Sequence, residues 1–468
     1  LNAVFNLLCT GLAAQEYLVN HRALDYLLTR KDIDPEHIGV YGSSGGGTQT
    51  AYYIGLDPRV KVAAICSFFS TRERTMELQG PSDGCQHIPY EGREQLEVPD
   101  FALMMAPRPL LILSGKYDFV DLWGAQQGYA ELQQCYKVLG VPEKVDMLTV
   151  ETGHGLGVEK RQKLVSWFKR WLKDDQSPVK KAAQDRFQLS DMLCTTRGQV
   201  NVSMPGALSI MQENVNQLDE WASKREAFLS KGKKTVQAKM LDLLGLKGLP
   251  DHKIRIEATG HDSMREYEQY KFQLIREGEM PVPCILIIPS RANADSPVEL
   301  RLQEEGKGTY LSEYANFAAA LTEGKILLLA DLRGLGETTD PAFYTDAKYW
   351  NREYRNAMIS MHIGRPIMGQ RVVDILTLLD FCSEHEFLKG HSVKVFANGI
   401  YGPAAIHAAY LDERINSVEI THSVKTWKEY IERPMQWDMY SNVLYGALKY
   451  YDLPDLIRLS NRSIRFAD

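Results

Sequence analysis

Apolar residues along the chain fall into two alternating patterns. Short continuous apolar runs predict buried strands of a parallel sheet, and in the first half of the chain they lie at 38–42, 62–66, 109–113 and 145–150. Other segments carry apolar residues at helical spacing, as in 159–173, where lysines and arginines occupy the opposite side. Strands that alternate with helices predict an α/β fold built on doubly wound, mostly parallel sheets.

The same alternation runs through the rest of the chain. At its beginning, the spacing of apolar residues predicts one helix over residues 1–35. In the second half, strands are expected at 270–275, 282–288 and 326–330, and a helix is expected at 356–383.

The length of 468 residues exceeds what one ordinary core supports, so two domains are expected. Residues 174–251 are charged and helix-prone, which favours a connector with its own helices. The predicted division is a first α/β domain over 1–175, a helical connector over 176–251 and a second α/β domain over 252–468.

An internal repeat relates the two predicted domains. With a constant offset of 355 positions, Leu24-Asp25-Tyr26 matches Leu379-Asp380-Phe381, and 56–60 matches 411–415. A constant offset across several elements predicts two copies of one fold and not a solenoid of short repeats. The first copy lacks counterparts of the second copy's early strands, and the second copy stops before its last ones. Both copies are therefore expected to be truncated parts of a longer two-domain protein.

The residues Gly42-Ser43-Ser44-Gly45-Gly46 join a predicted strand to a predicted helix. This is the setting in which a G-x-S-x-G motif presents a nucleophilic serine. Ser44 would lie on a strained turn with its hydroxyl exposed, and side chains two positions to either side would collide with the strand or the helix. In the register of the repeat, Gly399 stands opposite Ser44. The second copy therefore has no hydroxyl there and is expected to be a structural or binding module.

Two later strand ends offer the acid and the base that a serine nucleophile requires. Asp118 follows the strand at 109–113, and His154 follows the strand at 145–150. His154 would accept the proton of Ser44, and Asp118 would fix the imidazole tautomer and stabilise the imidazolium. Taken singly, Asp118 fits a helix cap and His154 a solvated turn residue, and Asp121 is an alternative acid.

The backbone N–H of Gly45 is expected to supply one donor of an oxyanion hole. The second donor normally comes from an earlier loop, which would lie upstream of Leu1. His87 falls between predicted strands and is expected to line a pocket or be structural. The segment 331–336 partly matches the dinucleotide-binding motif G-x-G-x-x-G. It lacks the third glycine, so nucleotide binding is not expected.

Composition and charge exclude several classes of function. The chain is 44% hydrophobic and 24% charged with a net charge of −6, which gives no reason to expect a nucleic-acid or anionic membrane partner. No apolar run approaches the ~18 residues of a membrane span. The seven cysteines are scattered without metal-ligand spacing and are expected to be buried small hydrophobes. One disulfide is left open, and no metal or cofactor is expected.

Several of these segments together resemble one enzyme family. The segments that carry the resemblance are the G-x-S-x-G turn at 42–46 (the nucleophile elbow), Ala106-Pro107-Arg108-Pro109, Gly115-Lys116-Tyr117-Asp118 and Gly153-His154. Through them, most of residues 20–172 resemble the acetyl xylan esterase and dienelactone-hydrolase-like branch of the α/β-hydrolase superfamily. The resemblance implies Ser44 as nucleophile, Asp118 as acid and His154 as base.

The second half resembles the same fold through Ala330-Asp331-x-Arg333-Gly334-x-Gly336. Residues 194–200 are similar to a segment that links tandem hydrolase domains. The resemblance therefore implies two α/β-hydrolase-type domains, of which the second is inactive because Gly399 replaces the serine.

The predicted function is metal-free serine ester hydrolysis through an acyl-enzyme. The ester would be carried by a small molecule or a polysaccharide, and the resemblance implies deacetylation of a plant polysaccharide such as xylan. A polysaccharide substrate favours secretion or a periplasmic location. Two alternatives stay open. A prolyl-oligopeptidase-like peptidase shares the elbow and the triad order but needs a propeller-like partner of many short strands. A non-catalytic carbohydrate-binding or scaffolding module would leave both copies inactive.

Overall fold

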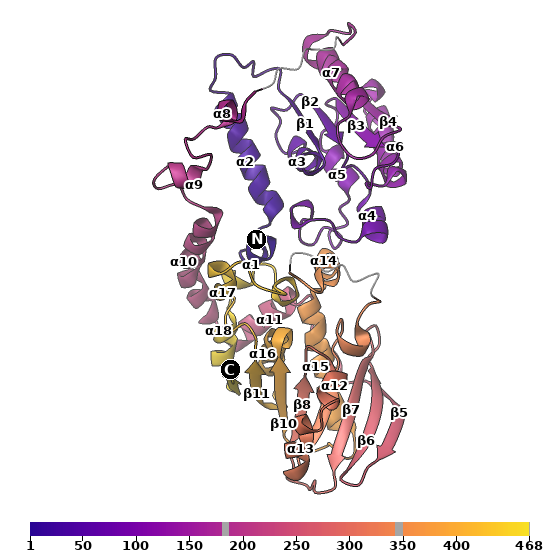
Figure 1. The fold of residues 1–468 in the computed structure, drawn as a ribbon, viewed down its shortest axis with the longest axis vertical. Coiled ribbons are helices and arrows are strands. Elements are labelled where there is room, and N and C mark those ends of the chain that lie inside the picture. The colour runs from indigo at the N-terminus through magenta and orange to yellow at the C-terminus, as the bar shows by residue number, and fades with distance from the viewer. Residues whose placement is uncertain (180–186, 342–349, 468) are drawn as a thin grey trace. The chain divides into compact units, whose positions relative to one another are not determined.

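The computed structural model describes residues 1–179, 187–341 and 350–467, which fold into two compact units (Figure 1). The N-terminal unit contains Thr10–Ser209, and the C-terminal unit contains Ile210–Asp468 together with Ala3–Cys9. Each unit has its own sheet, so the α/β class expected from the sequence is confirmed.

A four-stranded parallel sheet forms the centre of the N-terminal unit, in the order β1-β2-β3-β4. All four strands were expected from their apolar runs, and two of them begin and end where predicted. The strands are β1 (Gly39–Ser43), β2 (Val62–Cys66), β3 (Leu110–Gly115) and β4 (Val145–Val150).

Helices cover both faces of this sheet. Ala63 and Ile65 of β2 pack against α3, α5 and α6, whereas Val62 and Ala64 lie in a second cluster with α7. Strands that bury both faces carry continuous apolar runs, which is why these strands were readable from the sequence. The helices of this unit are α2 (Leu12–Leu27), α3 (Gly45–Ile54), α4 (Arg72–Gln79), α5 (Val98–Leu103), α6 (Leu122–Val138), α7 (Val158–Lys173), α8 (Leu189–Met192) and α9 (Val200–Ser203).

An eight-stranded mixed sheet forms the centre of the C-terminal unit, in the order β12-β11-β10-β8-β9-β7-β6-β5. The pairs among β5, β6, β7 and β9 are antiparallel, and those from β9 to β12 are parallel. The strands are β5 (Arg255–Ser263), β6 (Tyr267–Ile275), β7 (Val282–Pro289), β8 (Val298–Leu302), β9 (Ile326–Ala330), β10 (Val393–Asn398), β11 (Ile415–Thr421) and β12 (Ser463–Phe466).

Helices cover both faces of the eight-stranded sheet as well. Leu328 of β9 lies in the larger core with α15 and α16, whereas Leu327 and Leu329 pack against α13 on the other face. Within the predicted connector, α10 and α11 bury Leu218 and Val236 in the larger core. The helices of this unit are α1 (Asn2–Leu7), α10 (Ile210–Leu229), α11 (Lys233–Leu243), α12 (Lys307–Leu311), α13 (Ala315–Thr322), α14 (Tyr354–His362), α15 (Ile367–Glu384), α16 (Gly402–Leu411), α17 (Lys428–Glu432) and α18 (Leu453–Ser460).

The single helix predicted over residues 1–35 is wrong. The chain forms α1 and α2, separated at Gly11, whose extended backbone (φ −147°, ψ 164°) starts α2. Val4 and Leu7 of α1 are fully buried in the core of the C-terminal unit. The two helices therefore serve different units, which a local apolar pattern does not reveal.

The helix predicted over 356–383 is likewise two helices, α14 and α15. They are separated at Gly364, which has a positive φ of 73°, and at Pro366, which is the N-cap of α15. Three strands were missed, β5, β8 and β12. Of these, β5 and β12 lie at the edges of the sheet and expose alternate residues, so they carry no continuous apolar run.

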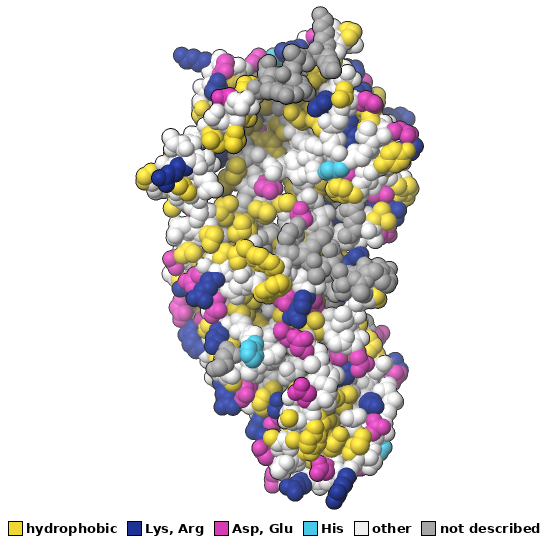
Figure 2. Space-filling model, in the orientation of Figure 1, with side chains coloured by type: hydrophobic (Ala, Val, Ile, Leu, Met, Phe, Trp, Pro, Cys, Tyr) yellow, Lys and Arg dark blue, Asp and Glu magenta, His cyan; other side chains and the backbone are white. Residues whose placement is uncertain are grey.

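Among the described residues, no helix combines the length and the apolar character that crossing a bilayer requires. Acidic and basic side chains are interspersed over the face drawn in Figure 2. All seven cysteines are unpaired. Cys66, Cys284 and Cys382 are buried, but Cys9 and Cys194 are exposed, so the expectation of buried small hydrophobes fails for these two.

The sequence repeat recurs in three dimensions as the same set of ion pairs. In the N-terminal unit, Arg59 binds Asp57 of the loop before β2 at 2.6 Å and Asp25 of α2 at 2.7 Å. The residues 355 positions later make the same cluster at the same distances, and they are Arg414, Asp412 and Asp380. In the N-terminal unit, Arg59 thus connects the loop before β2 to α2. In the C-terminal unit, Arg414 connects the loop before β11 to α15.

Candidate active site

Ser44 lies between β1 and α3 with a left-handed backbone (φ 59°, ψ −123°). A non-glycine residue there costs on the order of 1–3 kcal/mol and needs support from its surroundings. The Ser44 N–H donates to the Cys66 carbonyl at the end of β2 (3.0 Å), and the Ser44 carbonyl accepts from the Thr48 N–H (3.0 Å). The strained strand–turn–helix geometry expected of a nucleophile elbow is therefore present.

Two glycines make this turn possible, and only one of them is where the sequence reasoning placed it. A Cβ on Gly42 would overlap the Gly46 carbonyl, and a Cβ on Gly47 would lie 2.6 Å from the Cys66 carbonyl. Gly46 has no atom within 4 Å of an added Cβ. The prediction is right for Gly42 and wrong for Gly46, because the close approach on the helix side comes one residue later.

His154 and Asp118, which come from the ends of β4 and β3, are joined by a hydrogen bond. His154 Nδ1 lies 2.8 Å from Asp118 Oδ1. The Asp118 side chain is 1% exposed and that of His154 is 29% exposed. A carboxylate acceptor at Nδ1 favours the tautomer that leaves Nε2 as a base. The Phe119 ring stacks on the imidazole, with centroids 4.3 Å apart and planes at 21°.

The pKa of Asp118 lies below its ordinary value. Burial alone raises it, but the Val120 N–H, His154 and Ser67 together lower it by more. Asp118 is therefore a carboxylate throughout the neutral range, as an acid that orients a histidine must be.

Asp121, the alternative acid, has a different role. Its Oδ2 accepts from the Gly124 N–H (2.7 Å) at the start of α6 and from Arg74 Nε (3.2 Å). Asp121 is thus the N-cap of a helix. Of the two carboxylates, Asp118 is the one that binds His154.

The base and the elbow are anchored at the same strand end. Gly155, next to His154, has a carbonyl that accepts from Cys66 Sγ (3.7 Å), and the Cys66 carbonyl accepts from the Ser44 N–H. Among the described residues, Ser44 Oγ makes no hydrogen bond to His154. Bonds between a nucleophile and its base are commonly long before substrate binds, so this spacing is compatible with catalysis.

Two further residues hold the loop of the base, and the sequence reasoning missed both. Ser67 Oγ accepts from the Gly155 N–H (3.1 Å) and from Lys160 Nζ (3.2 Å), and Lys160 Nζ also donates to the Gly155 carbonyl (3.0 Å). Lys160 is fully buried. Its position on α7, four residues before Leu164 and on the apolar side of the helix, was the signal that could have revealed it.

Gly45 is the first residue of α3, so its N–H is one of those that the helix itself leaves without a carbonyl partner. An anion at this helix end is stabilised by these N–H groups and by the helix dipole. Gly45 is thus placed as expected for an oxyanion donor, next to Ser44.

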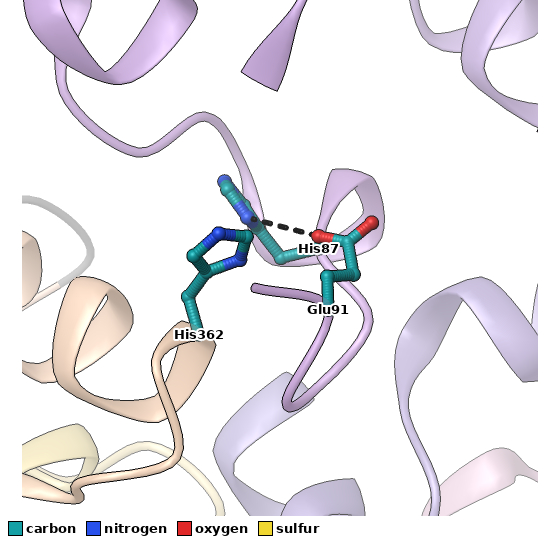
Figure 3. A group of neighbouring side chains, drawn as sticks. All are labelled: His87, Glu91 and His362. Atoms are coloured by element: carbon teal, nitrogen blue, oxygen red, sulfur yellow. Dashed lines mark ion pairs between the residues drawn. The ribbon is translucent and has the colours of Figure 1, made fainter. Parts of the chain in front are cut away.

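His87 is buried and belongs to a polar network away from this turn. Its Nδ1 lies 3.8 Å from Glu91 Oε2 (Figure 3, where His362 of the C-terminal unit is also drawn). The other Glu91 oxygen pairs with the buried Arg72 at 3.3 Å. The structural role expected for His87 fits this placement.

The segment 331–336 of the C-terminal unit is wrapped around a buried ion pair. Asp331 binds Lys307 Nζ (2.6 Å), and an added Cβ on Gly336 would overlap the Asp331 carboxylate. Gly334 has a positive φ of 91°. An added Cβ on Gly334 would overlap the Glu353 carboxylate, so both glycines follow from packing against buried charged side chains and not from phosphate binding.

The comparisons with known proteins return hydrolases and esterases. No protein-family model matches the chain. The chain is 26% identical over 152 residues to the "Putative hydrolase YtaP" of Bacillus subtilis (strain 168), which is 32% of this chain and about half of that relative (51%).

Among solved structures, the chain is similar to a "putative acetyl xylan esterase" from Bacteroides fragilis NCTC 9343, at 14% identity and a TM-score of 0.46 over 56% of this chain and 75% of that one. It is also similar to acetyl xylan esterase 1 from Thermoanaerobacterium sp. JW/SL YS485, at 14% identity and a TM-score of 0.34 over 50% and 77% of the two chains.

Proposed function

We propose that the N-terminal unit is a serine carboxylic-ester hydrolase that works through an acyl-enzyme. The observation that carries the proposal is the strained elbow at Ser44, anchored at the same end of β2 as the loop that holds His154 on Asp118. Nucleophile, acid and base follow the ends of β1, β3 and β4, in the chain order that this chemistry uses.

The reaction follows from the roles of these side chains. Ser44 Oγ attacks the ester carbonyl while His154 Nε2 takes the hydroxyl proton, and the negative charge on the carbonyl oxygen faces the Gly45 N–H. The intermediate collapses, the C–O bond to the alcohol breaks, and His154 returns the proton to that alcohol. Water, activated by His154, then hydrolyses the acyl-Ser44 ester. Asp118 stays ionised and orients the imidazole throughout.

We propose that both units are α/β-hydrolase-type folds related by the repeat. Two features support this. The turn after β10 leads into α16 as the turn after β1 leads into α3, and the clusters of Arg59 and Arg414 make equal contacts. In the second unit, Gly399 stands at the nucleophile position with a φ of 61°, close to the 59° of Ser44.

We propose an acyl group on a plant polysaccharide such as acetylated xylan as the substrate. Exposed aromatic rings flank Asp118, with Tyr117 65% and Phe119 61% exposed. Aromatic faces pack well against the apolar faces of sugar rings, and Phe119 itself lies on the imidazole of the base. A polymer of this kind is met outside the cell or in the periplasm, which is where we expect the enzyme to act.

A serine-directed fluorophosphonate probe tests the catalytic proposal in the chain that carries both units. Ser44→Ala should abolish labelling and the hydrolysis of p-nitrophenyl acetate. Ser43→Ala is the matched control, because Ser43 is the neighbouring hydroxyl at the end of β1 and should leave labelling intact. Labelling that survives in Ser44→Ala would overturn the proposal.

The substrate class needs a separate measurement. Acetate release from acetylated xylan, compared with cleavage of a peptide amide under the same conditions, should show turnover of the ester alone. Preferential cleavage of the amide would instead indicate a peptidase built on the same triad.

A further inference from the structure

The C-terminal unit has a cavity of about 470 Å³ at its own turn, where a hydrolase would bind substrate. It opens at the ends of β8, β10 and β11, and Gly399 lies in its wall. Ligands of open α/β sheets bind at the carboxyl ends of the strands, so this is the expected place for a site. The residues that decide its chemistry are Glu304, Arg352, Gly399, Trp437, Asp438 and Asn442.

A carboxylate takes the place of the missing nucleophile. Glu304 Oε2 accepts from the Ile400 N–H at 3.0 Å, which is the N–H that corresponds to the Gly45 donor of the first unit. A Cβ on Gly399 would overlap this carboxylate. The Glu304 carboxylate thus occupies the space of a nucleophile side chain and binds the neighbouring N–H, so this turn differs from the first one by more than the missing hydroxyl.

The polar groups of the cavity are held in place and are acidic in balance. Arg352 spans the two carboxylates, with Nη2 3.3 Å from Glu304 Oε2 and Nε 2.8 Å from Asp438 Oδ2. Glu429 adds a third carboxylate to the wall. Asn442 is 4% exposed, and its Oδ1 has no hydrogen-bond partner among the described residues. A buried acceptor of this kind favours a ligand that donates a hydrogen bond.

Two exposed tryptophans lie beside the polar groups. Trp437 is 70% exposed and lines the cavity, and Trp350 is 45% exposed with its ring 6.3 Å from that of Trp437 at 48°. Leaving two indole rings in water forgoes the gain of burying them, so a ligand surface that covers them would be stabilised.

The backbone that presents these rings is strained. Trp350 and Asp438 have positive φ angles of 63° and 53°, and the Asp438 N–H donates to the Trp350 carbonyl at 2.8 Å. Residues in the left-handed region persist where the surrounding structure fixes them, and they gather at functional sites. The surrounding structure thus fixes the Trp350 indole, which lies beside Trp437, and the Asp438 carboxylate of the cavity wall.

We propose that this cavity binds a neutral saccharide. The apolar faces of sugar rings would cover the indoles of Trp437 and Trp350, and the hydroxyl groups would donate to Glu304, Asp438 and Asn442. The three carboxylates outnumber Arg352, so an acidic sugar is disfavoured by like charge. That the saccharide belongs to the polymer deacylated by Ser44 rests on the proposed function. Binding there would raise the effective concentration of polymer near the catalytic unit.

Titration of the two-unit Ser44→Ala protein with xylohexaose, followed by calorimetry and tryptophan fluorescence, tests the proposal without turnover. We expect saturable binding with a change in fluorescence. Trp437→Ala should weaken the binding at least tenfold, and Glu304→Gln should weaken it as well. Tyr314→Ala removes an exposed ring outside the cavity and should bind as the parent does.

Three results would overturn the proposed saccharide site. The first is the absence of saturable binding of xylohexaose or cellohexaose. The second is binding by Trp437→Ala protein, correctly folded by circular dichroism, that is as tight as that of the parent, and the third is tighter binding of an oligogalacturonate than of the neutral sugars. Because binding is measured without Ser44, failure here is distinguishable from failure of the esterase proposal, which the fluorophosphonate probe reads.

Discussion

At the residue scale, the site depends on which of two nearby carboxylates meets the histidine. Asp118 and Asp121 are both short acidic side chains after β3, and sequence position favoured Asp118 but left Asp121 as an alternative. In the structure, Asp118 is hydrogen-bonded to His154, whereas Asp121 caps the first turn of α6. The same substitution, aspartate to asparagine, is therefore expected to impair catalysis at position 118 but not at position 121.

We expect Asp118→Asn to lower kcat by about 10³–10⁴-fold, because an amide favours the wrong tautomer of the imidazole. Asp121→Asn is the matched control. It keeps a capping side chain, so it should retain most of the activity and lose well under about 1 kcal/mol of stability. Esterase kinetics and thermal unfolding of the two variants check this. Similar kcat losses in both would contradict the assignment of Asp118.

The lowered pKa of Asp118 also predicts a dependence of stability on pH. A carboxyl group whose folded-state pKa lies below its unfolded value, about 3.9, stabilises the fold above that value. The contribution is lost as the pH falls through the folded pKa. The difference in unfolding free energy between wild type and Asp118→Asn should therefore be largest near neutral pH and shrink toward pH 3. Denaturant melts at several pH values measure it, and a difference that grows on acidification would contradict it.

Lys160 is expected to act as a positioning residue. Lys160→Met removes the two hydrogen bonds that Lys160 Nζ donates, to the Gly155 carbonyl and to Ser67 Oγ, so the loop that carries His154 should loosen. We expect kcat to fall about tenfold with little change in KM, and stability to fall by about 1–3 kcal/mol. Lys163→Met, on the same helix, is the control, since the described contacts of Lys163 are an ion pair with Asp146 and a cation–π contact with Trp167. A loss of stability with unchanged kcat would reduce Lys160 to a structural role.

At the scale of elements, the elbow works because α3 approaches β2 closely at one point. That point is Gly47, against the Cys66 carbonyl, and it lies outside the five-residue motif. The apolar patterns located the four strands of the N-terminal sheet but missed β5, β8 and β12, and they merged α1 with α2 and α14 with α15. Apolar spacing continues across a break when both helices bury a face, even in different cores.

Gly47→Ala and Gly46→Ala form a matched pair one residue apart. We expect Gly47→Ala to lower the free energy of unfolding by about 1–3 kcal/mol, because the new methyl group forces the helix away from β2. Gly46→Ala meets open space in the first turn of α3, so its effect should be neutral or stabilising by up to about 1 kcal/mol. Urea melts of both variants decide the matter, and equal destabilisation would show that the elbow is tight at both positions.

At the scale of the whole molecule, the chain carries one turn twice, with different chemistry in each copy. The first presents Ser44 at a φ of 59°, and the second presents Gly399 at 61° with Glu304 filling the space of a side chain. The arginine clusters of Arg59 and Arg414 support our proposal that the two units share one scaffold and differ at this turn.

The second turn should therefore not recover catalysis from a hydroxyl alone. In the Ser44→Ala background, we expect Gly399→Ser to remain unlabelled by the fluorophosphonate, because its Cβ would overlap the Glu304 carboxylate. Mass spectrometry of the labelled protein reports the site, and a probe adduct at position 399 would contradict this prediction.

The sequence by itself determined the α/β class, the strands of the N-terminal sheet and the repeat, and it predicted Ser44, Asp118 and His154 as a triad with Asp121 as the alternative acid. A buried parallel strand is a continuous apolar run, and the candidate triad residues directly follow strand ends. Short stretches of sequence therefore encode both features. Only the tertiary structure decided between Asp118 and Asp121, moved the tight glycine from Gly46 to Gly47, and assigned α1 to the second core. It also placed Lys160 under the loop of His154 and Glu304 against Gly399. These are contacts between segments far apart in the chain, and no local pattern of polar and apolar residues encodes them.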